Sequence, residues 1–304
     1  MLSTSAPLLI RPLLARFEQR RPIRAGSLII TLYGDAIAPR GGSLWLGSLN
    51  GLVGPFGIEP GLVRTALSRL VAEGWFVRNR FGQKSYYRLS AHGATEFGKA
   101  GQHIYAGGDT PWSGKLELEI LTHSDPKVRQ PMRENLARQG YGQLAPNVMV
   151  RPASGRRRAA SDPGLAGQTI RLIAAAGDPA GAQQLAAACW RLDQLGSAYR
   201  SLLDDLAGLT RQPQALAGLD DSHAFQVRLL LIHEWRRIVL HDPRLPRELL
   251  PVDWAGSEVR DAVRRIYRAV APGCERWLDA SAVNERGALP PPDKAAAARF
   301  ADRP

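Results

Sequence analysis

The stretch PGLVRTALSRLVAEGWFVRNRFGQKSYYRLS, residues 60–90, combines two hydrophobic periods and decides the fold of the N-terminal third of the chain. Its first half repeats apolar residues at helical spacing, which predicts a helix over Pro60–Glu73 that ends at Gly74. The apolar stripe of that helix is expected to consist of Leu62, Leu67, Leu70 and Val71.

The second half of the stretch alternates polar and apolar residues and predicts a β-hairpin over residues 75–89. WFVRNR and KSYYRLS would be the strands, and Phe81-Gly82-Gln83 the turn between them. Of the tyrosine pair in the second strand, Tyr86 and Tyr87, one is expected to face inward.

Two further helices are predicted upstream. Apolar spacing favours one helix over Ala25–Ile37, and Ser43 is expected to cap a second that runs to Gly54-Pro55. Three helices followed by a basic hairpin is the pattern of a winged helix-turn-helix, whose third helix enters the DNA major groove. An alternative is a protein-interaction module in which Arg64 and Arg69 are ordinary solvated charges.

Residues of the third helix and the hairpin are the candidate DNA contacts. Arginine can bind guanine with two hydrogen bonds, and basic or polar residues of a hairpin can contact phosphates or the minor groove. The predicted DNA-binding residues are Pro60, Gly61, Arg64, Thr65, Ser68, Arg69, Arg78, Arg80, Gln83, Lys84, Ser85 and Tyr86.

The charge distribution supports a polyanionic partner. The formal charge is +12, and residues 1–100 hold 13 Lys/Arg against 5 Asp/Glu, whereas residues 101–304 hold 27 against 23. Two thirds of the excess therefore lies in one third of the chain, which favours nucleic acid as a partner.

Other protein classes fit poorly. The longest apolar runs are far too short to cross a bilayer, the N-terminus lacks a secretory pattern, and only Cys189 and Cys274 occur. We therefore expect a soluble, cytoplasmic protein without a membrane partner, a disulfide framework or a zinc finger.

Composition divides the 304 residues into five segments of an α+β protein. We expect a basic arm or loose helix (1–24), a winged helix-turn-helix domain (25–107) and a middle domain (110–186). A helical C-terminal domain (187–284) for effector binding or dimerisation and a disordered or partly helical tail (285–304) follow. The loop at 151–167 is expected to be exposed and mobile.

The chain resembles the PaaX family, the bacterial repressors of phenylacetic acid degradation operons. The resemblance lies in SLIITLYGDAIAPRGGSLWLGSL, LVRTALSRLVAEGWFVRNR and GQKSYYRLS, and later in CWRLDQLGSAYRSLLDDL and FQVRLLLIHEWRRIVLHDPRLPRELLPVDWAG. It covers roughly residues 25–280 in the same order. Members often carry a second arginine after the wing glycine, where this chain has Gln83-Lys84, so operator preference does not carry over.

The resemblance implies a homodimeric transcriptional repressor that binds a double-stranded DNA operator. It also implies release by an effector, phenylacetyl-coenzyme A or a related acyl-coenzyme A, with no cofactor, and a middle domain similar to the ferredoxin-like fold of Cas2 proteins. The middle segment independently suggests a βαββα order that fits such a domain, with its last strand unplaced.

The Cas2 likeness raises a metal-dependent nuclease as the alternative function, with Asp125 as a metal ligand. Ser-Asp-Pro is, however, a typical helix start in which the aspartate caps free N–H groups, and no second acid clusters nearby. No other catalytic motif occurs, and Cys189 reads as a small core residue. We therefore predict a protein that is not an enzyme.

The C-terminal segment contains a strong helix over Phe225–Leu240, for which two interpretations remain open. In one, Arg228 and Arg236 pair with Asp242, Glu248 or Asp253 and have a structural role. In the other, basic and aromatic side chains bind the phosphates of an acidic effector. The candidate effector-binding residues are Arg228, His233, Arg236 and Trp254.

Overall fold

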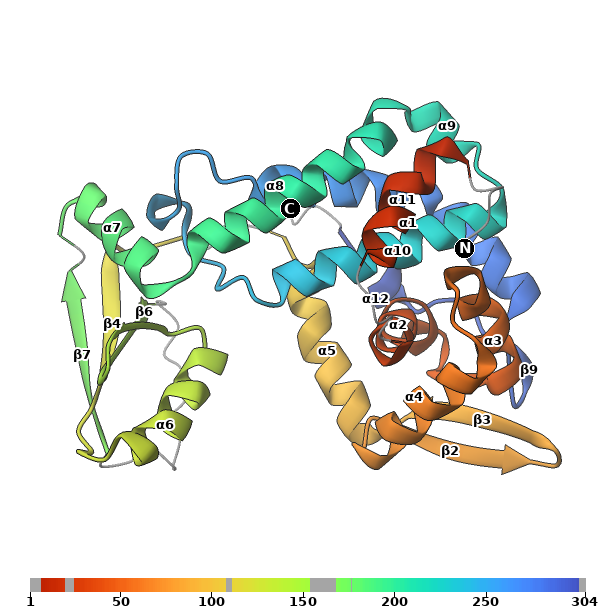
Figure 1. Cartoon of the computed structure of the whole chain (residues 1–304), viewed down its shortest axis with the longest axis horizontal. Coiled ribbons are helices and arrows are strands. Elements are labelled where there is room, and N and C mark those ends of the chain that lie inside the picture. The colour runs from red at the N-terminus through yellow and green to blue at the C-terminus, as the bar shows by residue number, and fades with distance from the viewer. Residues whose placement is uncertain (1–6, 20–24, 108–110, 154–167, 176, 301–304) are drawn as a thin grey trace. The chain divides into compact units, whose positions relative to one another are not determined.

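A computed structural model describes residues 7–19, 25–107, 111–153, 168–175 and 177–300 (Figure 1). Most of the predicted 151–167 loop lies outside the described residues. Contacts divide the chain into two compact units. The first contains residues 1–107, 199–240 and 257–304, and the second contains residues 108–198 and 241–256.

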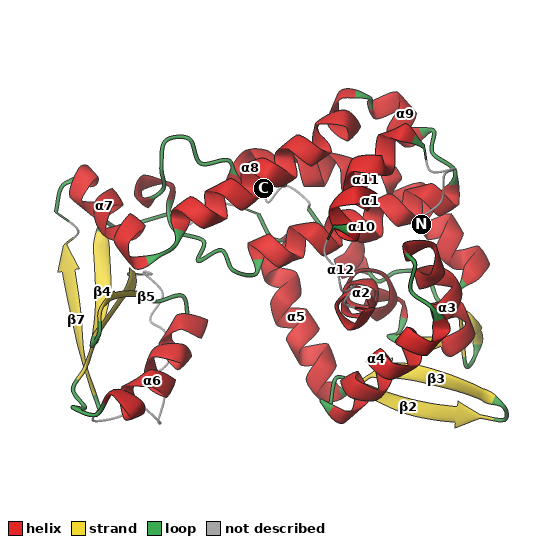
Figure 2. Ribbon diagram, in the orientation of Figure 1, coloured by secondary structure: helices red, strands yellow, loops and turns green. Residues whose placement is uncertain are grey.

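The N-terminal part of the first unit is mainly helical, with one short strand (Figure 2). After a 3-10 turn (Leu8–Ile10), its elements are α1 (Arg11–Glu18), α2 (Ala25–Leu32), a π-helical turn (Tyr33–Ile37), β1 (Ser43–Trp45), α3 (Leu46–Val53) and α4 (Pro60–Ala72). Helices α2 to α4 lie where the sequence predicts three helices.

A hairpin of β2 (Phe76–Phe81) and β3 (Lys84–Leu89) follows α4, as predicted. Phe81, which was expected in the turn, is instead the last residue of β2 and pairs with Lys84, so the turn is Gly82-Gln83. Gly82 has a φ of 58°, a backbone conformation that glycine adopts without a steric penalty and that the tight turn requires. The strands form an antiparallel sheet in the order β1-β3-β2. Helix α5 (Ala91–Tyr105) leads away from the hairpin and is capped by Ser90, whose hydroxyl accepts from the Gly93 amide at 2.9 Å.

Strand β1 corrects the prediction that Ser43 caps a helix. Ser43 pairs with Arg88 of β3, is buried, and donates its hydroxyl to Glu285 at 2.6 Å. Helix α3 instead starts at Leu46, and Trp45 occupies the cap position. The sequence could not reveal this because a three-residue strand is defined by its partner rather than by its own periodicity.

The C-terminal helices complete the core of the first unit. Helix α10 (Asp221–Val239) buries thirteen side chains, including both apolar and charged ones, so it lies inside the unit rather than on its surface. The remaining elements are α9 (Pro213–Ala217), α11 (Gly256–Ser281), β8 (Val283–Asn284), β9 (Gly287–Ala288) and α12 (Lys294–Ala297). Helix α8 (Leu192–Arg211) has residues in both units.

Both ends of the first unit are more ordered than expected. The described part of the predicted arm contains α1, whose Leu13 and Phe17 are buried, and its Arg16 pairs with Glu234. In the predicted disordered tail, Phe300 is buried, with its ring 5.1 Å from that of Tyr267. Apolar side chains that find a partner far along the chain hold both segments in place.

The second unit contains a four-stranded antiparallel sheet in the order β5-β6-β4-β7. Its elements are β4 (Lys115–Leu121), α6 (Pro126–Arg138), β5 (Gly142–Ala145), β6 (Val148–Pro152), β7 (Thr169–Ala175), α7 (Pro179–Cys189) and a 3-10 turn (Arg247–Leu249). Strand β5 is absent from the predicted βαββα order. Its few residues lack a strong alternation, and its pairing with β6 defines it.

The observed architecture is a mixture of helices and small sheets, and so α+β. In the part of the chain that the structure describes, no helix is long and apolar enough to span a bilayer. The five-segment division of the chain stays a prediction.

Candidate nucleic-acid interface

Helix α4 presents one polar face outward because its apolar residues follow a single stripe. Val63, Leu67 and Leu70 are buried at i, i+4 and i+7. Leu62, predicted for this stripe, is 49% exposed, and Val63 takes its place. The exposed residues of the helix include six predicted DNA contacts: Pro60, Gly61, Arg64, Thr65, Ser68 and Arg69.

The cations on this face differ in how they are held. Arg69 pairs with Glu73 one turn away, at 2.7 Å, on the exposed surface. Arg64 makes no hydrogen bond or ion pair with any residue that the structure describes, so its guanidinium is available to a partner. The Thr65 hydroxyl donates to the Gly61 carbonyl at 3.0 Å, which leaves its lone pairs for a further donor.

The hairpin presents four more exposed cations, Arg78, Arg80, Lys84 and Arg88, of which the first three are predicted DNA contacts. Arg78 donates to the Ser85 hydroxyl of the facing strand at 3.0 Å, and Arg80 donates to the turn carbonyl of Gly82 at 3.1 Å. The ammonium of Lys84 lies 4.9 Å from the ring centre of Trp45, a cation–π contact. Predicted Gln83 is exposed in the turn, and Ser85 is half-buried.

Tyr86 and Tyr87 are both buried, at 8% and 6% exposure, whereas only one of the pair was expected to face inward. The ring of Tyr86 packs against that of Phe81, with the centroids 5.7 Å apart. Tyr87 accepts the hydroxyl of Tyr33 on its carbonyl oxygen, at 3.0 Å. Tyr86 therefore has little surface left for DNA.

The α4–hairpin surface is cationic as a whole. Residues 60–89 contain six arginines and lysines against one glutamate, and that glutamate is paired with Arg69. The structure adds three exposed apolar residues that sequence reasoning missed: Leu62 on α4, and Val77 and Phe81 on the hairpin. Apolar side chains can contact a thymine methyl group or a sugar. Sequence reasoning missed two of them because it assigned Leu62 to the buried stripe of the helix and Phe81 to the turn.

A buried charged cluster holds the N-terminal helices on the C-terminal ones. Asp35, in the π-helical turn, accepts from Arg228 Nε at 2.7 Å, from the Tyr105 hydroxyl at 2.6 Å and from the Tyr267 hydroxyl at 3.2 Å. Arg299 of the tail adds a fourth contact. Burial by itself raises the pKa of Asp35, but the two arginines and the hydrogen bonds outweigh it and lower the pKa overall.

A second ion pair continues this cluster. Arg40, just before β1, is almost fully buried and pairs with Glu275 and with Asp279, the latter at 2.8 Å. Glu275 also pairs with Arg228, so one carboxylate bridges two buried arginines. The segment that connects α2 to α3 is therefore fixed by charges on α10 and α11, which positions α4 and the hairpin.

The candidate effector residues do not form one cluster. Arg228 and His233 are buried, and His233 Nδ1 lies 2.9 Å from the Thr31 hydroxyl. Arg236 donates to Ser27 and Thr31, and burial lowers its pKa. Trp254 belongs to the second unit, where it packs near Leu249.

The predicted partners of Arg228 are corrected by these contacts. Its carboxylate partners are Asp35 and Glu275, not Asp242, Glu248 or Asp253. Asp35 was not considered because it lies 193 residues away along the chain. The structural interpretation of Arg228 thus gains support with different partners, and effector binding by the four residues stays a prediction.

The nuclease alternative gains no support. Asp125 caps α6, accepting from the Lys127 amide at 2.8 Å, as its position before a proline predicted. Within the described ranges, no group of three or more His, Cys, Asp or Glu side chains is placed to hold a metal ion. Burial raises the pKa of Cys189 to about 11 and that of Cys274 to about 12, so both thiols stay protonated at neutral pH.

Comparison with known proteins gives the family. Residues 24–93 match the PaaX-like protein family, and residues 190–280 match the PaaX-like protein C-terminal domain. The chain is 35% identical over 286 residues to the transcriptional repressor PaaX of Escherichia coli strain K12, covering 92% of this chain and 90% of that protein. A solved structure, uncharacterized protein Rv0674 from Mycobacterium tuberculosis, is 28% identical, with 74% of this chain and 88% of that chain covered and a TM-score of 0.49. The matched models and the extent of the identity together show that this chain belongs to the PaaX-like protein family.

Proposed function

We propose that this chain is a DNA-binding transcriptional repressor of an aromatic, phenylacetate-type catabolic operon. In this proposal, α3 and α4 act as the helix-turn-helix, with α4 in the major groove, and the β2–β3 hairpin acts as the wing. The observation that carries the proposal is Arg64, an exposed arginine without a partner among the described residues, on the outward face of α4. The similarity to a transcriptional repressor over most of both chains supports it.

The proposed repressor is a cytoplasmic homodimer whose two α4 helices read the half-sites of a palindromic operator. An aryl-acetyl-coenzyme A effector would favour a dimer geometry that no longer matches the half-site spacing, and so would release the DNA. The second unit, with the strand order β5-β6-β4-β7, would be the ferredoxin-like domain that links or dimerises the protein.

A gel shift with the DNA upstream of the protein's own gene tests this function. At about 150 mM salt, a concentration at which non-specific binding is already weakened, wild-type protein should retain this DNA in preference to random DNA. Phenylacetyl-coenzyme A should relieve the retention. If the protein retains the DNA but the thioester does not relieve this retention, the repressor function stands and phenylacetyl-coenzyme A is rejected as its effector.

Charge reversal at Arg64 or Arg69 is the matching mutational test. Arg64→Glu should abolish preferential retention because the variant loses a base contact and gains repulsion from phosphates. Arg69→Glu also breaks the pair with Glu73, so we expect a comparable loss. Unchanged specific binding by Arg64→Glu would refute the assignment of α4, and the interaction-module alternative would then be favoured.

A further inference from the structure

Leu62 is an apolar side chain on the outward, polar face of α4. It is 49% exposed, whereas the apolar stripe of the same helix is buried. Among the described residues of the first unit, five large apolar side chains are exposed, and three of them, Leu62, Val77 and Phe81, lie within residues 60–89. Single apolar residues scattered over a surface are ordinary, but this concentration on a cationic surface calls for a partner with apolar groups.

The position of Leu62 along α4 favours contact with base edges. The helix begins at Pro60, so Leu62 lies in its first turn. In a helix-turn-helix, the N-terminal residues of the recognition helix contact the base edges. Gly61 precedes Leu62, and a Cβ atom placed on Gly61 meets no atom within 4 Å, so the space above this turn is open. Because Gly61 has no side chain, this turn can approach the bases closely.

The neighbours of Leu62 on α4 are hydrogen-bonding residues. At about 100° per residue, Leu62, Thr65 and Arg69 follow one edge of the exposed face, and Arg64 lies on the other side of Gly61. The Thr65 hydroxyl donates to the Gly61 carbonyl at 3.0 Å. A protein partner would need a contiguous patch of several apolar side chains. One apolar side chain among polar and basic ones instead matches the mixed chemistry of a base edge.

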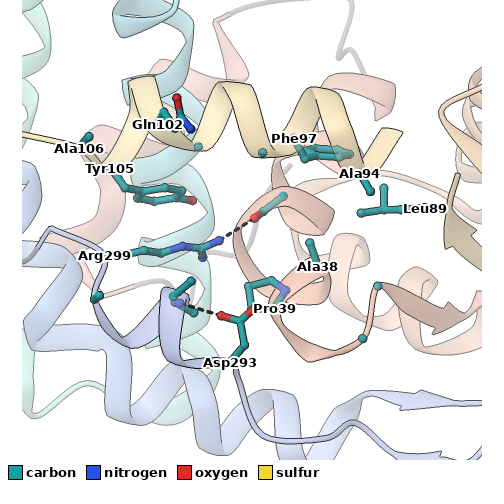
Figure 3. A pocket seen from close by; sticks show the side chains of 18 of the residues that line it. Ala38, Pro39, Leu89, Ala94, Phe97, Gln102, Tyr105, Ala106, Asp293 and Arg299 are labelled. Carbon is teal, nitrogen blue, oxygen red and sulfur yellow. Dashed lines mark hydrogen bonds between the residues drawn. The ribbon is translucent and has the colours of Figure 1, made fainter. Parts of the chain in front are cut away.

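The cavity of the first unit does not account for the exposure of Leu62. This cavity is lined by α5, by the segment Ala38–Gly42 and by the tail around α12 (Figure 3). It reaches the hairpin only at Arg88 and Leu89, and no described residue of α4 is among those that line it. The partner of Leu62 is therefore one that covers the surface of α4, and not a small molecule held in this cavity.

The DNA major groove offers one apolar group, the C5-methyl of thymine. All other groups that the bases present there are hydrogen-bond donors or acceptors, and apolar side chains contact the thymine methyl. Arg64, whose guanidinium has no partner among the described residues, can bind guanine with two hydrogen bonds. The start of α4 thus carries a side chain suited to guanine and one suited to thymine, on either side of Gly61.

We propose that Leu62 is a specificity-determining residue that contacts the methyl group of a thymine in each operator half-site. The inference rests on the proposed DNA-binding function, with α4 in the major groove. Contact between the leucine and the methyl group removes both from water, so thymine is preferred over uracil, which lacks only this methyl. Burial of one such group corresponds to about a fourfold difference in affinity, or about 0.8 kcal/mol.

Gel shifts of the full chain with methyl-free DNA test this role. The DNA upstream of the protein's own gene is prepared once with thymine and once with uracil at every thymine position, and both forms are compared at about 150 mM salt. We expect wild type to bind the uracil form at least fourfold more weakly. Leu62→Ala should bind the two forms within twofold of each other, because its side chain no longer reaches the methyl. Alanine is a strong helix former, so α4 is retained in this variant.

Three further variants make the test specific. Leu62→Met keeps an apolar side chain of similar volume and should keep most of the preference for thymine. Leu8→Ala truncates another exposed leucine of the first unit, outside α4 and the hairpin, and should behave as wild type. Thr65→Ser removes the other methyl group on this edge of α4 and should also keep the preference. Loss of the preference in Thr65→Ser, with its retention in Leu62→Ala, would overturn the assignment to Leu62.

The comparison separates this inference from the proposed function. Wild type that retains both forms equally, in preference to random DNA, would keep the repressor and refute the role of Leu62. A preference for thymine that Leu62→Ala keeps would refute it as well. Wild type that retains neither form in preference to random DNA would refute the repressor function, and the role of Leu62 with it.

Discussion

Removing the buried charge of Asp35 should destabilise the first unit strongly. Asp35→Asn keeps the shape of the side chain but removes its negative charge. In the wild type, this carboxylate accepts a hydrogen bond from Arg228 Nε at 2.7 Å. Arg228 and Arg299 then lose a buried counter-ion, and leaving a buried ion pair with one partner typically costs about 3–5 kcal/mol. Arg228 retains Glu275 and the two tyrosines can still donate to an amide oxygen, so we expect the lower end, about 3 kcal/mol.

Urea unfolding followed by tryptophan fluorescence measures this loss. Glu96→Gln, which removes an exposed pair with Lys99, is the matched control and should leave the unfolding free energy unchanged within error. The reasoning would be refuted if Asp35→Asn lowered the free energy of unfolding by less than about 1 kcal/mol, because a buried charge pair cannot be that weakly coupled.

The pH dependence gives a second check on the same carboxylate. Its pKa is lowered in the folded protein, so its contribution is fully present above the ordinary aspartate pKa, about 3.9, and is lost as the pH falls through the folded pKa. The difference between wild type and Asp35→Asn should therefore be constant above about pH 5 and shrink below about pH 4. A difference that grew with acidification would show that the pKa is raised instead.

Three further outcomes are expected. Gly93→Ala should destabilise the protein by about 1–3 kcal/mol in thermal or urea unfolding, because its Cβ would lie 2.3 Å from the Trp75 carbonyl oxygen. Gly98→Ala on the same helix is the control: its Cβ meets open space, so the free energy of unfolding should stay the same or rise. Asp125→Ala should lower stability by about 1 kcal/mol through loss of the cap, and equal stability would reject that role. Arg80→Ala should weaken binding to all DNA sequences. In gel shifts across a salt series, the slope of the logarithm of the binding constant against the logarithm of the salt concentration should become shallower by about 0.9. Weaker binding to only some sequences would contradict a phosphate contact.

Local chemistry made the fold of residues 60–89 predictable. The change of period after Gly74 predicts both α4 and the hairpin, because helix and strand periodicities are set by residues close in sequence. The same holds for the cap at Asp125, whose partner is two residues away. Resemblance to the PaaX family also lay in contiguous motifs, and the matched models confirm it.

Single positions were less predictable where packing selects among similar residues. Leu62 and Val63 are both apolar neighbours in a helix, and only the direction of the core shows that Val63 is buried and Leu62 exposed. Tyr86 and Tyr87 are a second example. Alternation along the strand places their side chains on opposite faces, but both faces of the hairpin are covered at this point, so both rings are buried.

The sequence by itself therefore determined the helices, the hairpin, the cationic bias and the family of this protein, since each depends on short-range pattern or composition. The tertiary structure alone decided that Ser43 is a strand residue, that the tail packs through Phe300, and that Asp35 is the counter-ion of Arg228 and Arg299. The physical reason is the same in each case: the partner lies far along the chain, and burial, which drives the pairing, is a property of the assembled fold.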